Sequence, residues 1–278
     1  MAEEKWLVEG PKVIDLGIVR HLKVALVRGQ VDIVGHDEPT TRVEVHAVSG
    51  KELRISMDGD SLEIDHPQLR WDNFIDVFRS FRGSASADVS ILVPRDVALK
   101  FGVVSASALI SGLRGDATIS TVSGDLVIDA LEGNITLNSV SGELAVQGHV
   151  GKIAAHTVSG DITASGRIRT FSCDGVSSDV FLDVKGEPEL VKVNTVSGNV
   201  TTRLEAGYGA DYRINTVSGR IQLDDSQITG VRGGYTGKYG TLDRSWLELR
   251  ANTVSGNISV LHDRASSRTT VGSDSSEG

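Results

Sequence analysis

The stretch Thr121-Val122-Ser123-Gly124-Asp125 recurs along the chain and decides the fold. It returns as Ser139-Val-Ser-Gly-Glu143 and Thr157-Val-Ser-Gly-Asp161, each 18 residues after the previous copy. The serines of this motif and its variants stand at Ser105, Ser123, Ser141, Ser159, Ser177, Ser197, Ser218 and Ser255. A fixed period of this size is the signature of a repeat architecture.

Each repeat contains two similar halves, because Gly115, Gly133 and Gly151 lie midway between the signature glycines. Apolar residues alternate with polar ones within a half, as in Leu126 and Ile128, and a period of two predicts strands. Nine residues suffice for a strand of about five residues and a turn of about four. Such connections cannot hold crossover helices, so parallel strands must arise by coiling.

The sequence therefore predicts an all-β chain, a parallel β-solenoid (β-helix) of about 18 residues per coil. Valine would lie in the core, serine at the corner, and glycine would permit the turn. Whether a coil has two or three strands stays open. Two columns of equivalent residues are expected to fill the core: Val122, Val140, Val158, Val176, Val196, Val217 and Val254, and Leu126, Leu144, Ile162, Val180, Val200, Ile221 and Ile258.

Both ends depart from the repeat. Residues 1–102 alternate in short runs broken by turns, and we predict a β-rich cap there, followed by solenoid repeats over 103–261 and a disordered tail over 262–278. The gap of 37 residues between Ser218 and Ser255 suggests one disguised coil with Thr236-Gly237-Lys238 in place of the signature. Trp246, Leu247 and Leu249 would close that end.

Composition narrows the function. A net charge of −9 without a clustered basic face disfavours nucleic acid as a partner, and Arg232-Gly233-Gly234 is expected to be a turn. The single cysteine, Cys173, is expected to be a buried apolar residue. No secretory leader and no run of about 18 apolar residues is seen, which favours a cytoplasmic location.

The repeated polar residues raise two chemical hypotheses. Asp125, Glu143, Asp161 and Asp179 form a ladder that is suited to Ca²⁺ in principle, yet solvated turn residues are the favoured interpretation. The serine column offers nucleophiles, but His149 and His156 have no repeated acidic partner, so a ladder of hydroxyls bonded to turn backbone is favoured. We expect no catalytic residue, no metal and no cofactor.

An aromatic segment breaks the acidic, aliphatic character of the chain. Apolar residues recur there at helical spacing, and arginines stand beside them. Two interpretations stay open: a piece packed over the end of the cap, or an amphipathic patch for a protein partner or an anionic membrane surface. The residues of the patch are Trp71, Phe74, Ile75, Phe78, Arg79, Phe81 and Arg82.

The Thr-Val-Ser-Gly-Asp repeats, Gly35-His36-Asp37 after an alternating strand, and Val93-Pro94-Arg95 before the first coil resemble the bacterial putative-adhesin or toastrack family, a family of unknown function. The resemblance implies a scaffold or sensor, because such members are associated with envelope-stress systems and membrane-anchored signalling proteins. We therefore expect a non-catalytic, adhesin-like interaction scaffold with a protein partner, and envelope association through that partner. The alternative is a carbohydrate-binding or carbohydrate-acting β-helix protein.

Overall fold

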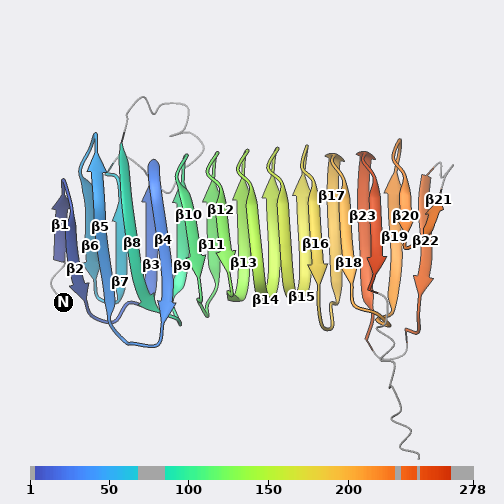
Figure 1. The fold of residues 1–278 in the computed structure, drawn as a ribbon, viewed down its shortest axis with the longest axis horizontal. Coiled ribbons are helices and arrows are strands. Elements are labelled where there is room, and N and C mark those ends of the chain that lie inside the picture. Colours follow the sequence, from blue (N-terminus) through green and yellow to red (C-terminus); the bar gives the residue numbers. More distant parts are fainter. Residues whose placement is uncertain (1–3, 68–84, 229–232, 243–244, 264–278) are drawn as a thin grey trace, which may run out of the picture.

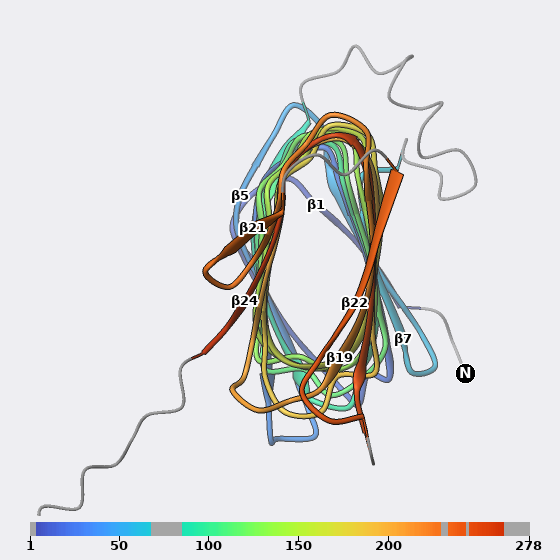
Figure 2. The same ribbon diagram turned by 90° about the vertical axis from the view of Figure 1, so that its right-hand side faces the viewer.

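The structure is a computed structural model that describes residues 4–67, 85–228, 233–242 and 245–263. Strands make up all of the regular structure in these ranges. They stack side by side into a long rod (Figure 1), and the view along the rod shows a flattened tube whose two long sides are sheet faces (Figure 2). Each central coil contributes one strand to each face.

The first face reads, in stacking order, β1 (Glu4–Val8), β6 (Leu53–Asp58), β7 (Ser61–Asp65), β3 (His21–Leu26), β9 (Ala98–Val103), β11 (Ala117–Thr121), β13 (Glu132–Ser139), the second half of β14 (Leu144–Thr157), the second half of β15 (Ile162–Gly175), β17 (Leu190–Ser197), β23 (Leu247–Ser255), β19 (Ala210–Thr216) and β22 (Gly233–Tyr239).

The second face reads, in stacking order, β2 (Lys12–Leu16), β5 (Thr41–Ser49), β8 (Ser86–Pro94), β4 (Arg28–His36), β10 (Ser107–Ser111), β12 (Leu126–Asp129), the first half of β14, the first half of β15, β16 (Val180–Val184), β18 (Val200–Leu204), β24 (Ile258–His262), β20 (Ile221–Leu223) and β21 (Ser226–Ile228).

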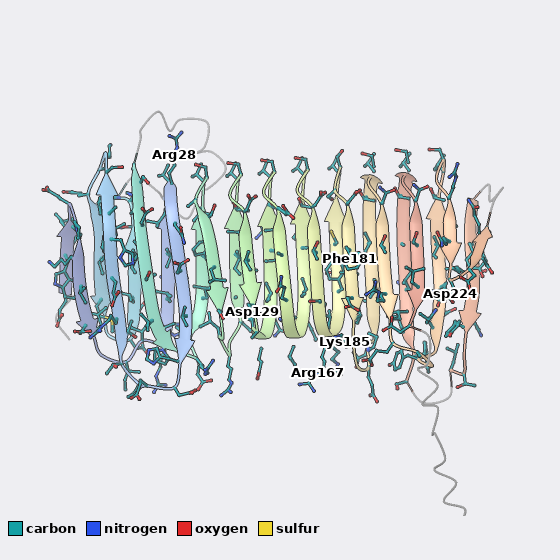
Figure 3. The ribbon with its side chains drawn as sticks, in the orientation of Figure 1. Arg28, Asp129, Arg167, Phe181, Lys185 and Asp224 are labelled. Atoms are coloured by element: carbon teal, nitrogen blue, oxygen red, sulfur yellow. The ribbon has the colours of Figure 1, made fainter. Side chains whose placement is uncertain are left out.

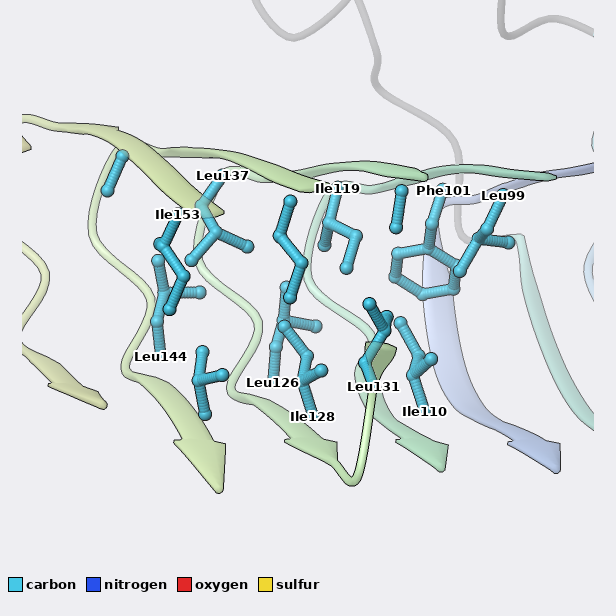
Figure 4. Close-up of a cluster of buried hydrophobic side chains, with 14 of the residues drawn as sticks. Leu99, Phe101, Ile110, Ile119, Leu126, Ile128, Leu131, Leu137, Leu144 and Ile153 are labelled. Carbon is cyan, nitrogen blue, oxygen red and sulfur yellow. The ribbon is translucent and has the colours of Figure 1, made fainter. Parts of the chain in front are cut away.

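The central coils follow the register that the repeat predicts. Leu126 pairs with Leu144, which pairs with Ile162, and all of these strands run parallel. The apolar residues of the two faces meet inside the tube (Figure 4), where the column from Leu126 to Ile258 is buried throughout. The prediction of an all-β, solenoid-like fold is therefore confirmed, whereas uniformly parallel pairing is not, because both ends contain antiparallel strands.

The prediction that the column of valines lies in the core is wrong. Val140 is 39% exposed and Val196 is 51% exposed, whereas the hydroxyl residue before each valine, such as Thr121, is buried. The reason is the alternation itself: Thr121 continues the inward series of Ile119, so the next side chain points outward. Only Val122 of this column is buried, in a separate small cluster.

The signature glycine is needed for stacking more than for an unusual backbone angle. A Cβ on Gly142 would lie 2.2 Å from the carbonyl oxygen of Gly124 in the previous coil. The same close approach repeats at Gly160, whose Cβ would meet the Gly142 oxygen at 2.1 Å. Glycine at this position therefore lets successive turns sit at sheet spacing.

At the N-terminal end the stacking order departs from the chain order. The coil formed by β3 and β4 lies between β7/β8 on one side and β9/β10 on the other, parallel to both. Beyond it, β6 and β1 continue the first face and β5 and β2 the second, all with antiparallel pairing. The chain thus places an early coil inside the rod and returns to build the end.

At the C-terminal end, too, one coil is inserted out of chain order. The last coil, β23 and β24, is inserted between β17/β18 and β19/β20, as Figure 1 shows by its red strand inside the orange region. The predicted disguised coil is wrong, because β22, which contains Thr236 and Gly237, pairs antiparallel with β19 as an edge strand. Leu247 and Leu249 are buried within the stack instead of closing it, and Trp246 is 45% exposed.

Candidate functional site

The hydroxyl groups of the turns are engaged with backbone. The Thr121 Oγ1 accepts a hydrogen bond from the Gly124 N–H at 2.9 Å, and Ser139 and Thr157 repeat this bond at 3.1 Å. The following serine donates to the previous coil, as Ser141 Oγ does to the Val122 carbonyl at 3.0 Å. The ladder of hydroxyls bonded to turn backbone, predicted from the sequence, is therefore confirmed.

The residues after the signature glycines form a second ladder, the post-glycine column. Side-chain oxygens of this column accept backbone N–H groups of the next coil: Asp125 accepts from Glu143 at 3.2 Å, Asp161 from Asp179 at 2.9 Å, and Asp179 from Asn199 at 2.7 Å. The ladder continues through the inserted coil to the end of the rod. Among the described residues, no three His, Cys, Asp or Glu side chains gather as a metal site. In stacking order the column reads Asp125, Glu143, Asp161, Asp179, Asn199, Asn257 and Arg220.

A third ladder, the pre-threonine column, lies on the other side of the turns. Its asparagines bond side chain to side chain, and His156 approaches Asp174 at 3.9 Å with both groups exposed. The nearest serine of this column, Ser120, is two coils from His156, about 9.6 Å away at sheet spacing, which is too far for a nucleophile and its base. In stacking order the column reads Ser120, Asn138, His156, Asp174, Asn194, Asn252 and Asn215.

Cys173, His66 and His149 are buried titratable groups within the coils. Cys173 is 1% exposed, and burial, with a smaller effect of Asp174, raises the pKa of its thiol to about 12, as expected for an inert core residue. Burial lowers the pKa of His66 to about 4, against an opposing effect of Asp65. Burial also lowers the pKa of His149, which lies between the two halves of β14.

A hydrogen-bonded network joins four elements at the C-terminal end. His262 Nδ1 lies 3.0 Å from an Asp224 carboxylate oxygen, and His262 Nε2 lies 3.0 Å from the Tyr212 hydroxyl. The Tyr239 ring stacks on the imidazole at 3.6 Å between centroids. Burial, with a smaller effect of Asp224, raises the pKa of Tyr212. The network fastens β24, β19, β22 and the turn after β20, with Tyr212 2% exposed and the Asp224 side chain 37% exposed.

Six exposed valines form a row along one edge of the rod, which we call the valine edge. Its six valines stand at the same turn of six consecutive coils. Arg28 belongs to the equivalent turn between β3 and β4 and is labelled at the upper edge in Figure 3, whereas Arg167 and Lys185 lie toward the opposite edge. A groove of about 390 Å³ runs beside its first members and is lined also by Asn138 and His156. In stacking order the valine edge is Val140, Val158, Val176, Val196, Val254 and Val217.

The predicted partner or membrane patch lies outside the described residues. Trp71, Phe74, Ile75, Phe78, Arg79, Phe81 and Arg82 all fall within 68–84. The described chain resumes at Ala85, which is buried against Val104 and Val122 at the N-terminal end of the same edge. Arg232 lies outside the described residues, and Gly233 and Gly234 belong to β22, so the prediction of a turn is wrong for these two glycines. The sequence analysis did not predict the valine edge. The inward alternation of Ala117, Ile119 and Thr121 would have indicated that the next residue, the valine, points outward.

Within the described part of the chain, no helix meets the length and hydropathy needed to cross a bilayer. No curated protein matches the sequence significantly. Three solved structures are distant likenesses: a "putative adhesin" from Bacteroides fragilis (11% identity, 91% of this chain and 98% of that chain, TM-score 0.46), a "putative adhesin" from Parabacteroides distasonis (13%, 94% and 97%, 0.43) and a "putative lipid binding protein" from Parabacteroides distasonis (12%, 91% and 97%, 0.42). A family model matches residues 19–275. The chain therefore belongs to the Toastrack DUF4097 family.

Proposed function

We propose that this chain is a non-catalytic interaction scaffold, an adhesin-like binding protein that engages a protein partner along the valine edge. The valine edge itself carries the proposal. Val158, Val176 and Val196 are each about half exposed on adjacent coils, and the row continues in both directions. A contiguous exposed apolar row is uncommon on a soluble surface and is typical of a contact site.

The neighbouring polar groups favour binding over catalysis. Hydroxyls such as Ser141 and carboxylates such as Asp161 are held in regular hydrogen bonds to backbone, which fixes the shape of the edge. A nucleophile needs one distinct base within hydrogen-bond reach. A repeated, backbone-bonded ladder instead gives a rigid surface on which side chains are presented at constant spacing.

The aromatic segment is the second part of the proposal. Residues 70–82, with Trp71, Phe78 and Arg79 among them, would contact the same partner or an anionic membrane surface. Its support is the composition of the segment together with the position of Ala85, the first described residue after it. Ala85 packs beside Val104 and Val122, which precede the valine edge at the same turn of the earlier coils. A cytoplasmic location and a link to bacterial envelope-stress signalling belong to this proposal as well.

The test compares purified, tagged full-length chains as bait for proteins of the native host. Val176→Asp/Val196→Asp should lose most of the captured partner, whereas Val127→Asp should keep it, because Val127 is an equally apolar exposed valine away from the edge. Capture that is unchanged by the double substitution contradicts a role for the edge. Cleavage or specific retention of a glycan in a parallel screen would favour the carbohydrate alternative.

A matched experiment tests the aromatic segment. Trp71→Ala/Phe78→Ala should weaken capture or binding to phosphatidylglycerol vesicles, and Arg79→Gln/Arg82→Gln should weaken only the vesicle binding because it removes charge. Circular dichroism and melting temperature establish that each variant is folded. A variant that fails to fold supports the competing interpretation, in which the segment packs over the cap.

A further inference from the structure

The valine edge has a geometry that matches a copy of itself. Its members repeat at the spacing of adjacent strands, about 4.8 Å, and a row with constant spacing can face an identical row along its whole length. The exposed fraction rises from 39% at Val140 to 78% at Val217, so one end of the row protrudes more than the other. A partner that runs in the opposite direction would place the protruding end of one row against the recessed end of the other.

The charges beside the row are also distributed unevenly along it. The post-glycine column is acidic from Glu143 to Asp179 and then changes to asparagine, ending at Arg220. When two rods meet edge to edge in opposite directions, each flanking column faces its own copy in reverse. The register that covers all six valines places Val176 opposite Val196 of the other copy.

That register was chosen only to cover the valines, yet it places each carboxylate of the column opposite an amide or an arginine. Asp179 faces Asn199 of the second copy, and Asp161 faces Asn257. Glu143 faces Arg220, and the symmetry makes this ion pair twice, once at each end of the row. Within the described residues, neither the Glu143 carboxylate nor the Arg220 guanidinium takes part in an ion pair of its own chain.

The groove adds a complementary shape to this arrangement. It lies beside Val122, Val140 and Val158, and its volume is about 390 Å³. In the same register Val140 is opposite Val217, so the most exposed valine of one copy is directed at the recessed coils of the other. Knob and groove then meet at both ends of the two-fold contact.

A parallel arrangement brings two carboxylates together. Two rods that run in the same direction would set the post-glycine column of one against the pre-threonine column of the other, coil by coil. Asp179 would then face Asp174, and the two-fold symmetry would repeat this like-charge contact. The protruding ends of the rows would also meet each other.

We propose that the occupant of the valine edge is a second copy of this chain, bound as an antiparallel two-fold dimer centred between Val176 and Val196. The inference rests on the proposed function, because it names the partner that the same edge takes. The row is one turn wide, so the contact is small and the dimer weak, with a dissociation constant on the order of 10 µM.

Sedimentation velocity of the full chain, over a concentration range around that value, tests the dimer. The wild type should shift from monomer to dimer, and Val176→Asp/Val196→Asp should raise the dissociation constant at least tenfold, because it gathers four carboxylates at the two-fold axis. Val127→Asp, an exposed valine on β12, should leave the dissociation constant within twofold. A wild type that stays monomeric, or a dimer that the edge substitutions leave intact, overturns the proposal.

A charge reversal tests the direction and register. Glu143→Arg and Arg220→Glu should each weaken the dimer severalfold, because each places like charges opposite one another. The combined variant Glu143→Arg/Arg220→Glu should return the dissociation constant toward that of the wild type. If the combined variant is weaker than either single variant, the antiparallel register is wrong.

The dimer and the proposed function can fail separately. Sedimentation uses the purified chain alone, whereas capture uses proteins of other sequence. A monomeric wild type whose capture still depends on Val176 and Val196 removes the second copy as occupant and keeps the scaffold. A dimer with no captured partner in either variant identifies self-association as the use of the edge and contradicts a different protein partner there.

Discussion

The central coils and the two ends of the rod contribute strands to the same two sheet faces but are assembled by different rules. From β9 to β18 each coil stacks on its neighbour in sequence, so Leu126, Leu144 and Ile162 follow one another in register. At each end, one coil is inserted out of chain order and the last strands turn antiparallel. A regular solenoid therefore gains ends that are tied to its interior, and exposed parallel edges are replaced by antiparallel ones.

The largest expected effect is the loss of a buried leucine, compared between the inserted coil and a central coil. Leu249→Ala in β23 and Leu137→Ala in β13 each remove a buried leucine and should each lower the free energy of unfolding by about 4 kcal/mol. The pattern of hydrogen exchange should differ between the two variants. Leu249→Ala should also speed amide exchange in β19, which comes before β23 in the chain but pairs with it. Leu137→Ala should affect, among the strands next to β13, only β11 and β14. Amides of β19 that stay protected while β23 exchanges would contradict insertion.

The next effect concerns how closely the central turns stack. Gly142→Ala should destabilise the chain by about 3 kcal/mol, because its Cβ would lie 2.2 Å from the Gly124 oxygen and two coils must separate. Gly17→Ala, at the N-terminal end, is the control, since a Cβ there meets nothing within 4 Å. Urea denaturation gives both values. Equal effects at the two glycines would mean that turn flexibility, not close stacking, requires glycine.

One central coil exchanges two of its turn residues, and this predicts a coupled effect. Gly175 stands opposite Thr157, and Ser178 takes the usual place of glycine, with its Oγ only 2.5 Å from where a Gly175 Cβ would be. Gly175→Thr should therefore cost about 2 kcal/mol through this clash, and Ser178→Gly about 1 kcal/mol. The double variant restores the Thr-Val-Ser-Gly turn and should recover most of the loss. Additive losses in a double-mutant cycle would refute the exchange.

The same contrast explains what the sequence could and could not predict. Alternation from Leu126 to Ile128 and the period of 18 depend on neighbouring residues, so strands and central register follow from the sequence. Stacking order does not follow, because Asn199, Asn257 and Arg220 continue one ladder whichever chain order links them. The outward direction of the valines was predictable from the alternation within each strand. They were assigned to the core because valine is the apolar residue of the repeated motif, whereas the hydroxyl residue before it points inward.

The last expected effect is a pH dependence that belongs to the N-terminal end. His66 Nδ1 accepts the Val27 N–H at 3.4 Å, and burial lowers the pKa of the imidazole to about 4. The unfolded chain, with a histidine pKa near 6.5, therefore binds a proton at higher pH than the folded chain does. Stability should fall by about 2.5 kcal/mol as the pH decreases from about 6.5 to about 4.

His66→Gln removes the titrating group and should make the unfolding free energy flatter over this pH range. His21→Gln, at an exposed histidine, is the control and should retain the wild-type slope, because it leaves the buried His66 in place. Urea denaturation at several pH values measures the slope. A stability that rises on acidification contradicts the prediction. If His66→Gln keeps the full slope, protonation at the N-terminal end does not set the acid response, and His149 of the central coils, whose pKa is also lowered by burial, becomes the group to replace next.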